Sequence, residues 1–188
     1  MSKMLGATAL AALLLVSAAA ADDKPQEIEL GKVYSIHSET EGGFYKDYNY
    51  SGLAKAKTVR LTLSVTKQLP SPDWIPGGRF FFDENQQIID DDDPKVAIPL
   101  VHFAGKGAMP ISLGVMLDKE IRDAQTYKRT LALNQKVNFE VSWATAGKLS
   151  VTVDGQEKRE IAVPRKIDFL QIVLNSGTYK VEEMIFRN

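Results

Sequence analysis

A run of four consecutive aspartates, Asp90 to Asp93, is the clearest candidate for metal chemistry in this sequence. Calcium binds about six to eight oxygens of carboxylates and carbonyls, and Asp90, Asp91, Asp92 and Asp93 could supply several of them. The spacing argues against such a site, because adjacent residues on an extended chain point in different directions and no glycine folds the loop around an ion. Pro94 also favours an extended Asp93. Two interpretations stay open: a calcium site, and a solvated hairpin end that prevents edge pairing.

The segment GGFYKDYNYSG is rich in aromatic residues, with tyrosines at Tyr45, Tyr48 and Tyr50 and an aspartate and an asparagine between them. Sugar-binding proteins stack aromatic rings on sugar rings and direct amides and carboxylates at the hydroxyls. Tyrosine-rich loops also suit protein interfaces, since rigid aromatic side chains give contact area at a low entropy cost. A third interpretation is an ordinary strand with half of its aromatic side chains in the core.

Trp74 and Glu140 are two further candidates for ligand binding. Trp74 stands in the proline-rich segment PSPDWIPGG, where it would form either a ligand platform or a plug over one end of a sandwich. Glu140 lies in the alternating segment NFEVSW, on the face opposite its apolar residues, and would line a ligand groove if that face bound a ligand. It is the first carboxylate to test if an activity is found.

The chain has two histidines, His37 and His102. Histidine is the side chain whose ordinary pKa allows proton transfer near neutral pH. A metal site or an acid–base pair would require the two to be adjacent in space, and nothing in the sequence indicates this. Both are therefore interpreted as structural residues.

Alternation with a period of two dominates the segments that must position these side chains. Residues 57–67, KTVRLTLSVTK, place Val59, Leu61, Leu63 and Val65 on one face, as a half-buried strand does. Asp154-Gly155 is a strong hairpin signal. Strands are expected at 28–37, 57–67, 78–83, 86–90, 96–103, 110–118, 126–133, 137–144, 147–154, 158–163, 167–174 and 178–187.

The remaining segments are less regular. Residues 117–125, LDKEIRDAQ, are the one helical candidate, with an edge strand as the alternative. The segments 40–56 and 68–77 are expected to be loops. The pattern predicts an all-β domain in which two antiparallel sheets pack face to face as a β-sandwich.

The N-terminal segment predicts export. Lys3 precedes an apolar run, and small residues around Ala19 and Ala21 form a cleavage pattern, so residues 1–21 are interpreted as a bacterial signal peptide and 22–188 as the mature domain. A periplasmic or secreted location follows. No second apolar segment of about 18 residues appears, so no membrane span is expected in the mature chain. The chain has no cysteine and a net charge of −1, which excludes thiolate chemistry and argues against nucleic-acid binding.

The C-terminal third, Asn138 to Asn188, consists of two strands, a D-G turn, a strand, an apolar strand and a closing strand. This order resembles the end of concanavalin A-like lectin and glucanase domains, including laminin-G-like modules. The resemblance implies a two-sheet jelly roll that binds or cleaves glycans on its concave face or rim. The E-x-D-x-x-E strand of the glucanases, the galectin tryptophan motif and the arginine-rich and Q-I-H strands of alginate lyases are missing. The resemblance therefore supports the fold more than an activity.

Three functions remain in competition. The first is an exported, non-catalytic β-sandwich that binds a carbohydrate or cell-envelope ligand. The second is a periplasmic protein-binding module, such as an inhibitor or an immunity protein, which would show an exposed apolar and aromatic patch. The third is a glycan hydrolase or lyase with an atypical site, which would show two carboxylates across a cleft about 5–9 Å wide. Apart from calcium at the aspartate run, no cofactor is expected.

Overall fold

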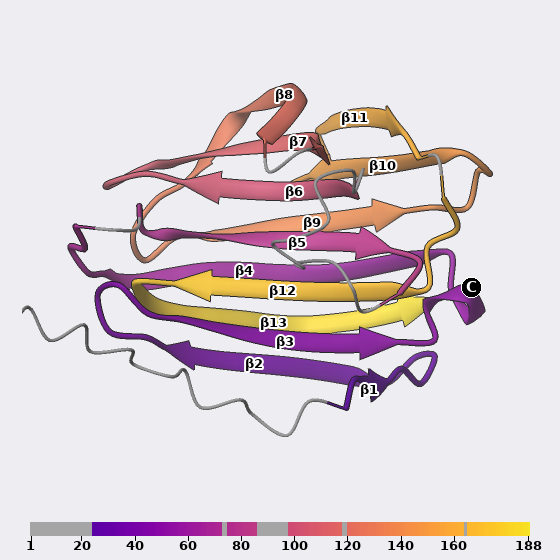
Figure 1. Ribbon diagram of the computed structural model, residues 1–188, viewed down its shortest axis with the longest axis horizontal. Coiled ribbons are helices and arrows are strands. Elements are labelled where there is room, and N and C mark those ends of the chain that lie inside the picture. Colours follow the sequence, from indigo (N-terminus) through magenta and orange to yellow (C-terminus); the bar gives the residue numbers. More distant parts are fainter. Residues whose placement is uncertain (1–23, 73–74, 86–97, 118–119, 164) are drawn as a thin grey trace, which may run out of the picture.

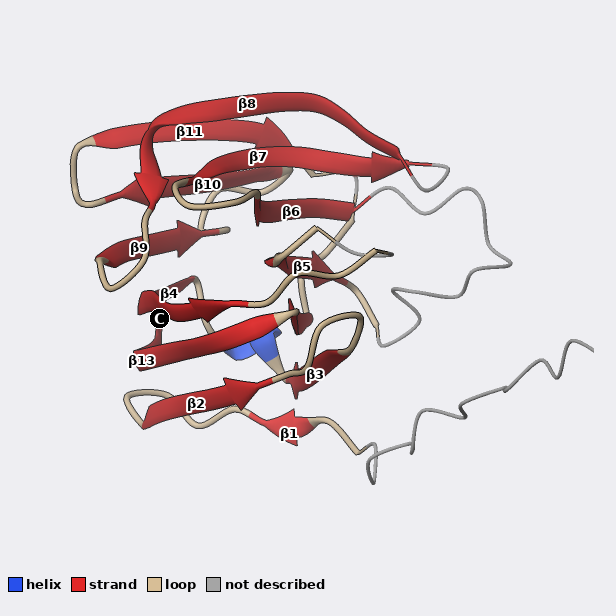
Figure 2. Cartoon of the chain, turned by 90° about the vertical axis from the view of Figure 1, so that its left-hand side faces the viewer, coloured by secondary structure: helices blue, strands red, loops and turns tan. Residues whose placement is uncertain are grey.

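A computed structural model describes residues 24–72, 75–85, 98–117, 120–163 and 165–188. They form two β-sheets packed face to face, with nearly parallel strand directions (Figures 1 and 2). The described residues contain one short 3-10 helix, Leu53–Lys55, and no helix among them is long and apolar enough to cross a membrane. The all-β, two-sheet architecture expected from the alternation is confirmed.

The larger sheet, called the front sheet below, has seven strands in the order β1-β3-β12-β5-β6-β7-β8. Neighbouring strands are antiparallel, except that β1 runs parallel to β3. The strand bounds are β1 Gln26–Glu27, β3 Tyr45–Ser51, β12 Phe169–Asn175, β5 Gly77–Asp83, β6 Ile98–Ala104, β7 Met109–Leu117 and β8 Glu120–Leu131.

The back sheet has six antiparallel strands in the order β11-β10-β9-β4-β13-β2. Their bounds are β11 Glu157–Ala162, β10 Lys148–Val153, β9 Lys136–Ser142, β4 Thr58–Gln68, β13 Gly177–Arg187 and β2 Val33–Glu39. The long C-terminal strand β13 pairs with both β4 and β2, so the end of the chain stabilises the centre of this sheet.

The hydrophobic core lies between the sheets and is built by alternate residues of each strand. In β4, Val59, Leu63 and Val65 are fully buried, as their period of two predicts. Aromatic rings join the two layers: the Phe80 ring of β5 lies 6.3 Å from that of Phe139 in β9. Burial of these apolar side chains supplies the main stabilisation of a chain that has no disulfide.

The D-G hairpin is confirmed. Asp154 and Gly155 have φ values of 49° and 68°, and they connect β10 to β11. Positive φ at both residues is what a tight hairpin turn of this type requires. The Asp154 carboxylate also accepts hydrogen bonds from Arg129 Nε at 2.8 Å and from the Asn138 backbone amide at 2.8 Å.

The segment 40–56, expected to be a loop, contains the regular strand β3, so this prediction was wrong. For residues 117–125 the alternative of an edge strand is confirmed, because residues 120–125 belong to strand β8. Strand β8 is the edge of the front sheet, which leaves much of its first half exposed on both faces and accounts for its polar composition. The register shift opposite residues 113–115 and the positive φ of Asp123 further obscure its alternation. The expected strand 86–90 and the expected signal peptide 1–21 lie outside the described residues.

Candidate functional site

The outer face of the front sheet, called the front face below, carries an unusual set of polar side chains. Its orientation follows from β12, where Leu170, Ile172 and Leu174 are fully buried in the core. Because side chains alternate along a strand, Gln171 and Asn175 point outwards. The same alternation in β5 places Phe80 and Phe82 in the core and turns Arg79 and Phe81 outwards.

The strand register aligns outward residues of six neighbouring strands in one row across the front face. From β3 to β8 the row consists of Asp47, Val173, Arg79, His102, Ser112 and Thr126. The hydroxyls of Ser112 and Thr126 lie 3.1 Å apart. In the next row towards the Tyr45 end, β5 and β6 contribute the small residues Gly77 and Ala104.

Arg79 and His102 are half-buried neighbours at the centre of the row. Burial lowers the pKa of the Arg79 guanidinium, and no described residue forms a hydrogen bond or an ion pair with it. Burial, helped by the positive charge of Arg79, lowers the pKa of His102 to about 4. His102 is therefore neutral at physiological pH and can both donate and accept a hydrogen bond.

Three polar side chains form a hydrogen-bonded group on β3 and β12. The Asp47 carboxylate accepts hydrogen bonds from Asn49 Nδ2 at 3.1 Å and from Gln171 Nε2 at 3.2 Å. The side-chain oxygens of Asn49, Gln171 and Asn175 are buried and have no hydrogen-bond partner. Buried polar atoms are usually satisfied in proteins. Side-chain atoms of Ser38, Trp143 and Arg159, elsewhere among the described residues, are unsatisfied in the same way, so these oxygens do not by themselves mark a binding site.

Exposed aromatic residues lie at one end of this face. Tyr45 is 51% exposed and pairs with Asn175 of β12, and the preceding Phe44 is 50% exposed. Tyr48 and Tyr50 have the opposite orientation: Tyr48 packs against the core, and Tyr50 is 4% exposed with its ring 5.7 Å from that of Tyr34. The interpretation of this segment as a strand with half of its aromatics in the core is confirmed. Of the three candidate tyrosines, the structure leaves only Tyr45 open to a ligand.

The other end of the front face is apolar and buried. Phe81, Ile98, Leu100 and Phe169 form a second hydrophobic cluster and are at most 3% exposed. On β5 and β6 the polar residues therefore lie towards the Tyr45 end, whereas on β3 and β12 Asn49 and Gln171 lie in the same row as Phe81. The name "polar half" is used below for the front-face side chains of Tyr45, Asp47, Asn49, Gln171, Asn175, Arg79 and His102.

The outer face of the back sheet, called the back face, holds Glu140. Here β4, β9, β10 and β13 surround a shallow hollow of about 520 Å³. Glu140 lies in this hollow, but its carboxylate is bound to Arg60 Nε at 2.6 Å. The hydroxyl of Thr62 likewise donates to Asn138 Oδ1 at 2.9 Å. Glu140 and Tyr45 therefore lie on opposite faces and cannot contact the same small ligand.

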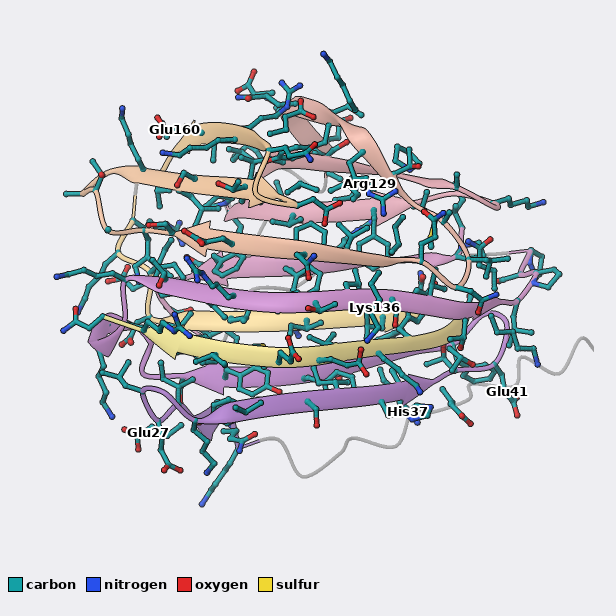
Figure 3. All side chains as sticks on the ribbon, turned by 180° about the vertical axis from the view of Figure 1, so that it is seen from behind. Glu27, His37, Glu41, Arg129, Lys136 and Glu160 are labelled. Carbon is teal, nitrogen blue, oxygen red and sulfur yellow. The ribbon has the colours of Figure 1, made fainter. Side chains whose placement is uncertain are left out.

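The two histidines do not form a pair. His37 belongs to β2 of the back sheet and its Nε2 lies 3.1 Å from Glu39 Oε1, whereas His102 belongs to the front sheet. Figure 3 looks onto the back face, where His37 and Lys136 project towards the solvent. Neither histidine contributes to a metal cluster, since no group of three or more ligating residues is found within the described ranges. Trp74 and the Asp90–Asp93 run lie outside those ranges.

Sequence reasoning missed Arg79, Gln171 and Asn175. Arg79 interrupts the apolar segment GGRFFFD, and Gln171 interrupts FLQIVLN. A single polar residue within an apolar strand is a signal of a half-buried outward position, and this signal was available. What the sequence does not supply is the register that aligns β3, β12, β5 and β6.

The folded chain is similar to solved structures of glycan-related proteins. The carbohydrate-binding module CBM66 from Bacillus subtilis superposes with a TM-score of 0.50 at 11% identity, covering 84% of this chain and 92% of that one. A β-glucanase from Bacillus licheniformis gives a TM-score of 0.51 at 10% identity, covering 88% and 90%. No family model and no curated protein sequence matches this chain. These similarities show the fold alone, and they confirm the two-sheet jelly-roll architecture expected from the sequence.

Proposed function

We propose that this chain is an exported, non-catalytic carbohydrate-binding protein that binds a glycan across the polar half of the front face. The observation that carries the proposal is the concentration of unsatisfied polar groups beside an exposed aromatic ring. Arg79 has no partner within the described residues, and three amide oxygens nearby lack hydrogen bonds. A half-buried charge without a partner costs stability in the free protein, which favours a ligand that pairs with Arg79.

The chemistry of this half suits a sugar. A pyranose ring has apolar C–H faces and a rim of hydroxyl groups, and it therefore needs both an aromatic surface and directed polar groups. The half-exposed ring of Tyr45 offers the first. The amide of Asn175 and the neutral imidazole of His102 offer the second, because both can donate and accept hydrogen bonds. A protein named as a carbohydrate-binding module shares the fold and so adds support.

The proposal of a non-catalytic role rests on the carboxylates. Glycoside hydrolysis commonly uses two carboxyl groups about 5–9.5 Å apart. Within the described residues, Asp47 is the one carboxylate of the polar half, and Asn49 and Gln171 already bind it. Asp83, the acidic residue of β5, lies at the apolar end and is 3% exposed.

Binding is tested by isothermal titration calorimetry and affinity electrophoresis with a panel of envelope and plant polysaccharides. We expect at least one to bind, and Tyr45→Ala to weaken its binding about tenfold, or about 1.4 kcal/mol. The matched control is Glu140→Ala on the back face, which is expected to leave affinity unchanged. Equal loss in both variants, or no binding to any polysaccharide, would contradict the proposal. Release of reducing sugar by the unmodified protein would contradict the non-catalytic part alone.

Export is tested separately. N-terminal sequencing of the protein recovered from a bacterial periplasm or culture medium is expected to begin at Ala21 or Asp22, since the cleavage pattern ends there. Recovery of an uncleaved chain in the cytoplasm would remove this part of the proposal and leave the binding part standing.

A further inference from the structure

Arg79 is a cation without an ion-pair partner among the described residues. Its guanidinium is half-buried on the front face, and no described residue forms a hydrogen bond or an ion pair with it. Burial of an unpaired charge is among the costlier features a fold can carry. A folded protein usually pairs such a group, and the missing partner here is negatively charged.

The immediate neighbours of Arg79 do not supply that charge. In the row across the sheet it is flanked by Val173 on one side and His102 on the other. His102 stays neutral at physiological pH, because burial lowers its pKa to about 4. Beyond His102 come the hydroxyls of Ser112 and Thr126, which are also uncharged.

The two described carboxylates of the front face that lie nearest to Arg79 already have other partners. Asp47 lies beyond Val173 in the row and accepts hydrogen bonds from Asn49 and Gln171. Asp83 is four residues further along β5, or about 13 Å at the rise of a strand. Its Oδ1 is 3.7 Å from Arg165 Nη1 and accepts a hydrogen bond from the Glu84 backbone amide.

We infer that the glycan bound by this face carries carboxylate groups, as a polymer of uronic acids does, and that Arg79 binds one of them. This inference rests on the proposed glycan site and names its ligand class. The planar fork of a guanidinium matches a planar carboxylate with two parallel hydrogen bonds. The hydroxyls of a neutral sugar would satisfy the donors of Arg79 but would leave its buried charge without compensation. A single guanidinium among neutral neighbours fits one carboxylate with a single negative charge.

The inference is tested with polygalacturonate, alginate and hyaluronate, each beside its own carboxyl-reduced form. Reduction converts each uronic acid into the corresponding neutral sugar and leaves the linkages unchanged. Calorimetric titration of the full chain is expected to give at least a tenfold higher affinity for one acidic polymer than for its reduced form. The affinity for that polymer should fall as sodium chloride rises from about 0.05 M to about 0.5 M, because salt screens the charge pair.

Three variants test whether Arg79 causes the preference for the acidic polymer over its reduced form. Arg79→Gln is expected to remove the preference for the acidic form, and Arg79→Lys to retain part of it, since lysine keeps the charge and loses the fork. Arg60→Gln on the back face is the matched control and is expected to retain the full preference. The melting temperature of each variant is recorded, and the chemically reduced polymers test the inference in the unmodified protein even if Arg79→Gln unfolds.

The outcomes separate this inference from the proposed function. Equal binding of acidic and reduced polymers, or binding of neutral polysaccharides alone, overturns the inference and leaves the glycan site intact. A preference for the acidic form that survives Arg79→Gln assigns the charge recognition to another residue and also overturns it. Absence of binding to every polymer, acidic and neutral, overturns both.

Discussion

The two outer faces of this sandwich differ in whether their half-buried polar side chains have partners. On the back face, two ion pairs join neighbouring strands: Arg60 binds Glu140 at 2.6 Å and Lys136 lies 2.7 Å from Glu182. On the front face, Arg79 has no partner within the described residues, and the amide oxygens of Gln171 and Asn175 are buried and unsatisfied. Both faces are built on regular strands with the same alternation, so the strands themselves do not explain the difference.

The contrast indicates which face is adapted to a ligand. Exposed ion pairs such as Arg60–Glu140 keep a surface hydrated and add little stability. Unsatisfied and desolvated groups reduce stability, and they persist where function requires them. In the hollow on the back face, Glu140 and Thr62 already have partners, and the charged residues Glu183 and Arg187 are exposed. We therefore place the proposed site on the front face, because half-buried Arg79 has no partner among the described residues.

The largest effect expected from this comparison concerns the buried end of the front face. Phe81 points outwards from β5 and is nevertheless 1% exposed. Phe81→Ala should therefore lower the free energy of unfolding by about 3–5 kcal/mol, as a core substitution does. On the back face, half-buried Ile185→Ala should cost about 1 kcal/mol. Urea denaturation measures both, and equal losses would show that the front face is no more buried than the back.

The two histidines give a matched test of the faces by pH. In the unfolded chain histidine titrates near pH 6.5, whereas folded His102 takes a proton only near a pKa of about 4. The neutral form thus stabilises the fold fully above about pH 6.5, and this stabilisation is lost as pH falls from there towards 4. After allowance for its partial exposure, the loss should be about 1–2 kcal/mol.

Urea denaturation at about pH 7 and about pH 4.5 measures this loss. His102→Gln should reduce the pH dependence by that amount, and His37→Gln on β2, where the side chain is 56% exposed, is the control. An identical pH dependence in the unmodified protein and in both variants would refute the burial of His102. The comparison between variants cancels the titration of Asp83, whose pKa burial raises.

The smallest effect concerns the unpaired arginine itself. Arg79→Met keeps the length of the side chain and removes a desolvated charge, so it should raise the free energy of unfolding by about 1 kcal/mol. Arg60→Met removes an exposed, paired charge and should change it by less than about 1 kcal/mol in the destabilising direction. A clear loss of stability in Arg79→Met would mean that the guanidinium stabilises the free protein, and the contrast between the faces would disappear.

Much of the fold was predictable from local pattern. The apolar alternation from Val59 to Val65 gave strand β4, and Asp154-Gly155 gave the hairpin between β10 and β11. Strand β3 was missed because its tyrosines and charges are typical of a loop, and it is held in place by β12, which lies more than a hundred residues away. Strand β8 was ambiguous because an edge strand has no fully buried face to enforce alternation.

The site was less predictable than the fold. Tyr45 was among the residues chosen from the sequence, but Tyr48 and Tyr50 turn inwards. Which tyrosines face outwards depends on which alternate positions of the strand face the core, and the sequence did not show this. Arg79 and His102 are 23 positions apart in the sequence, and nothing local shows that they are cross-strand neighbours. Whether a charge has a partner is a property of this register, and it becomes visible only when the sheets are assembled.

The most direct test of the central claim is the location of a bound glycan by NMR. Amide chemical shifts of the ¹⁵N-labelled protein are followed during titration with a polysaccharide fragment that binds in the calorimetric panel. The account predicts that the largest changes fall on β3, β5, β6 and β12, around Tyr45, Arg79 and His102. Changes concentrated on β4 and β9 around Arg60 and Glu140 would place the ligand on the back face and contradict the account.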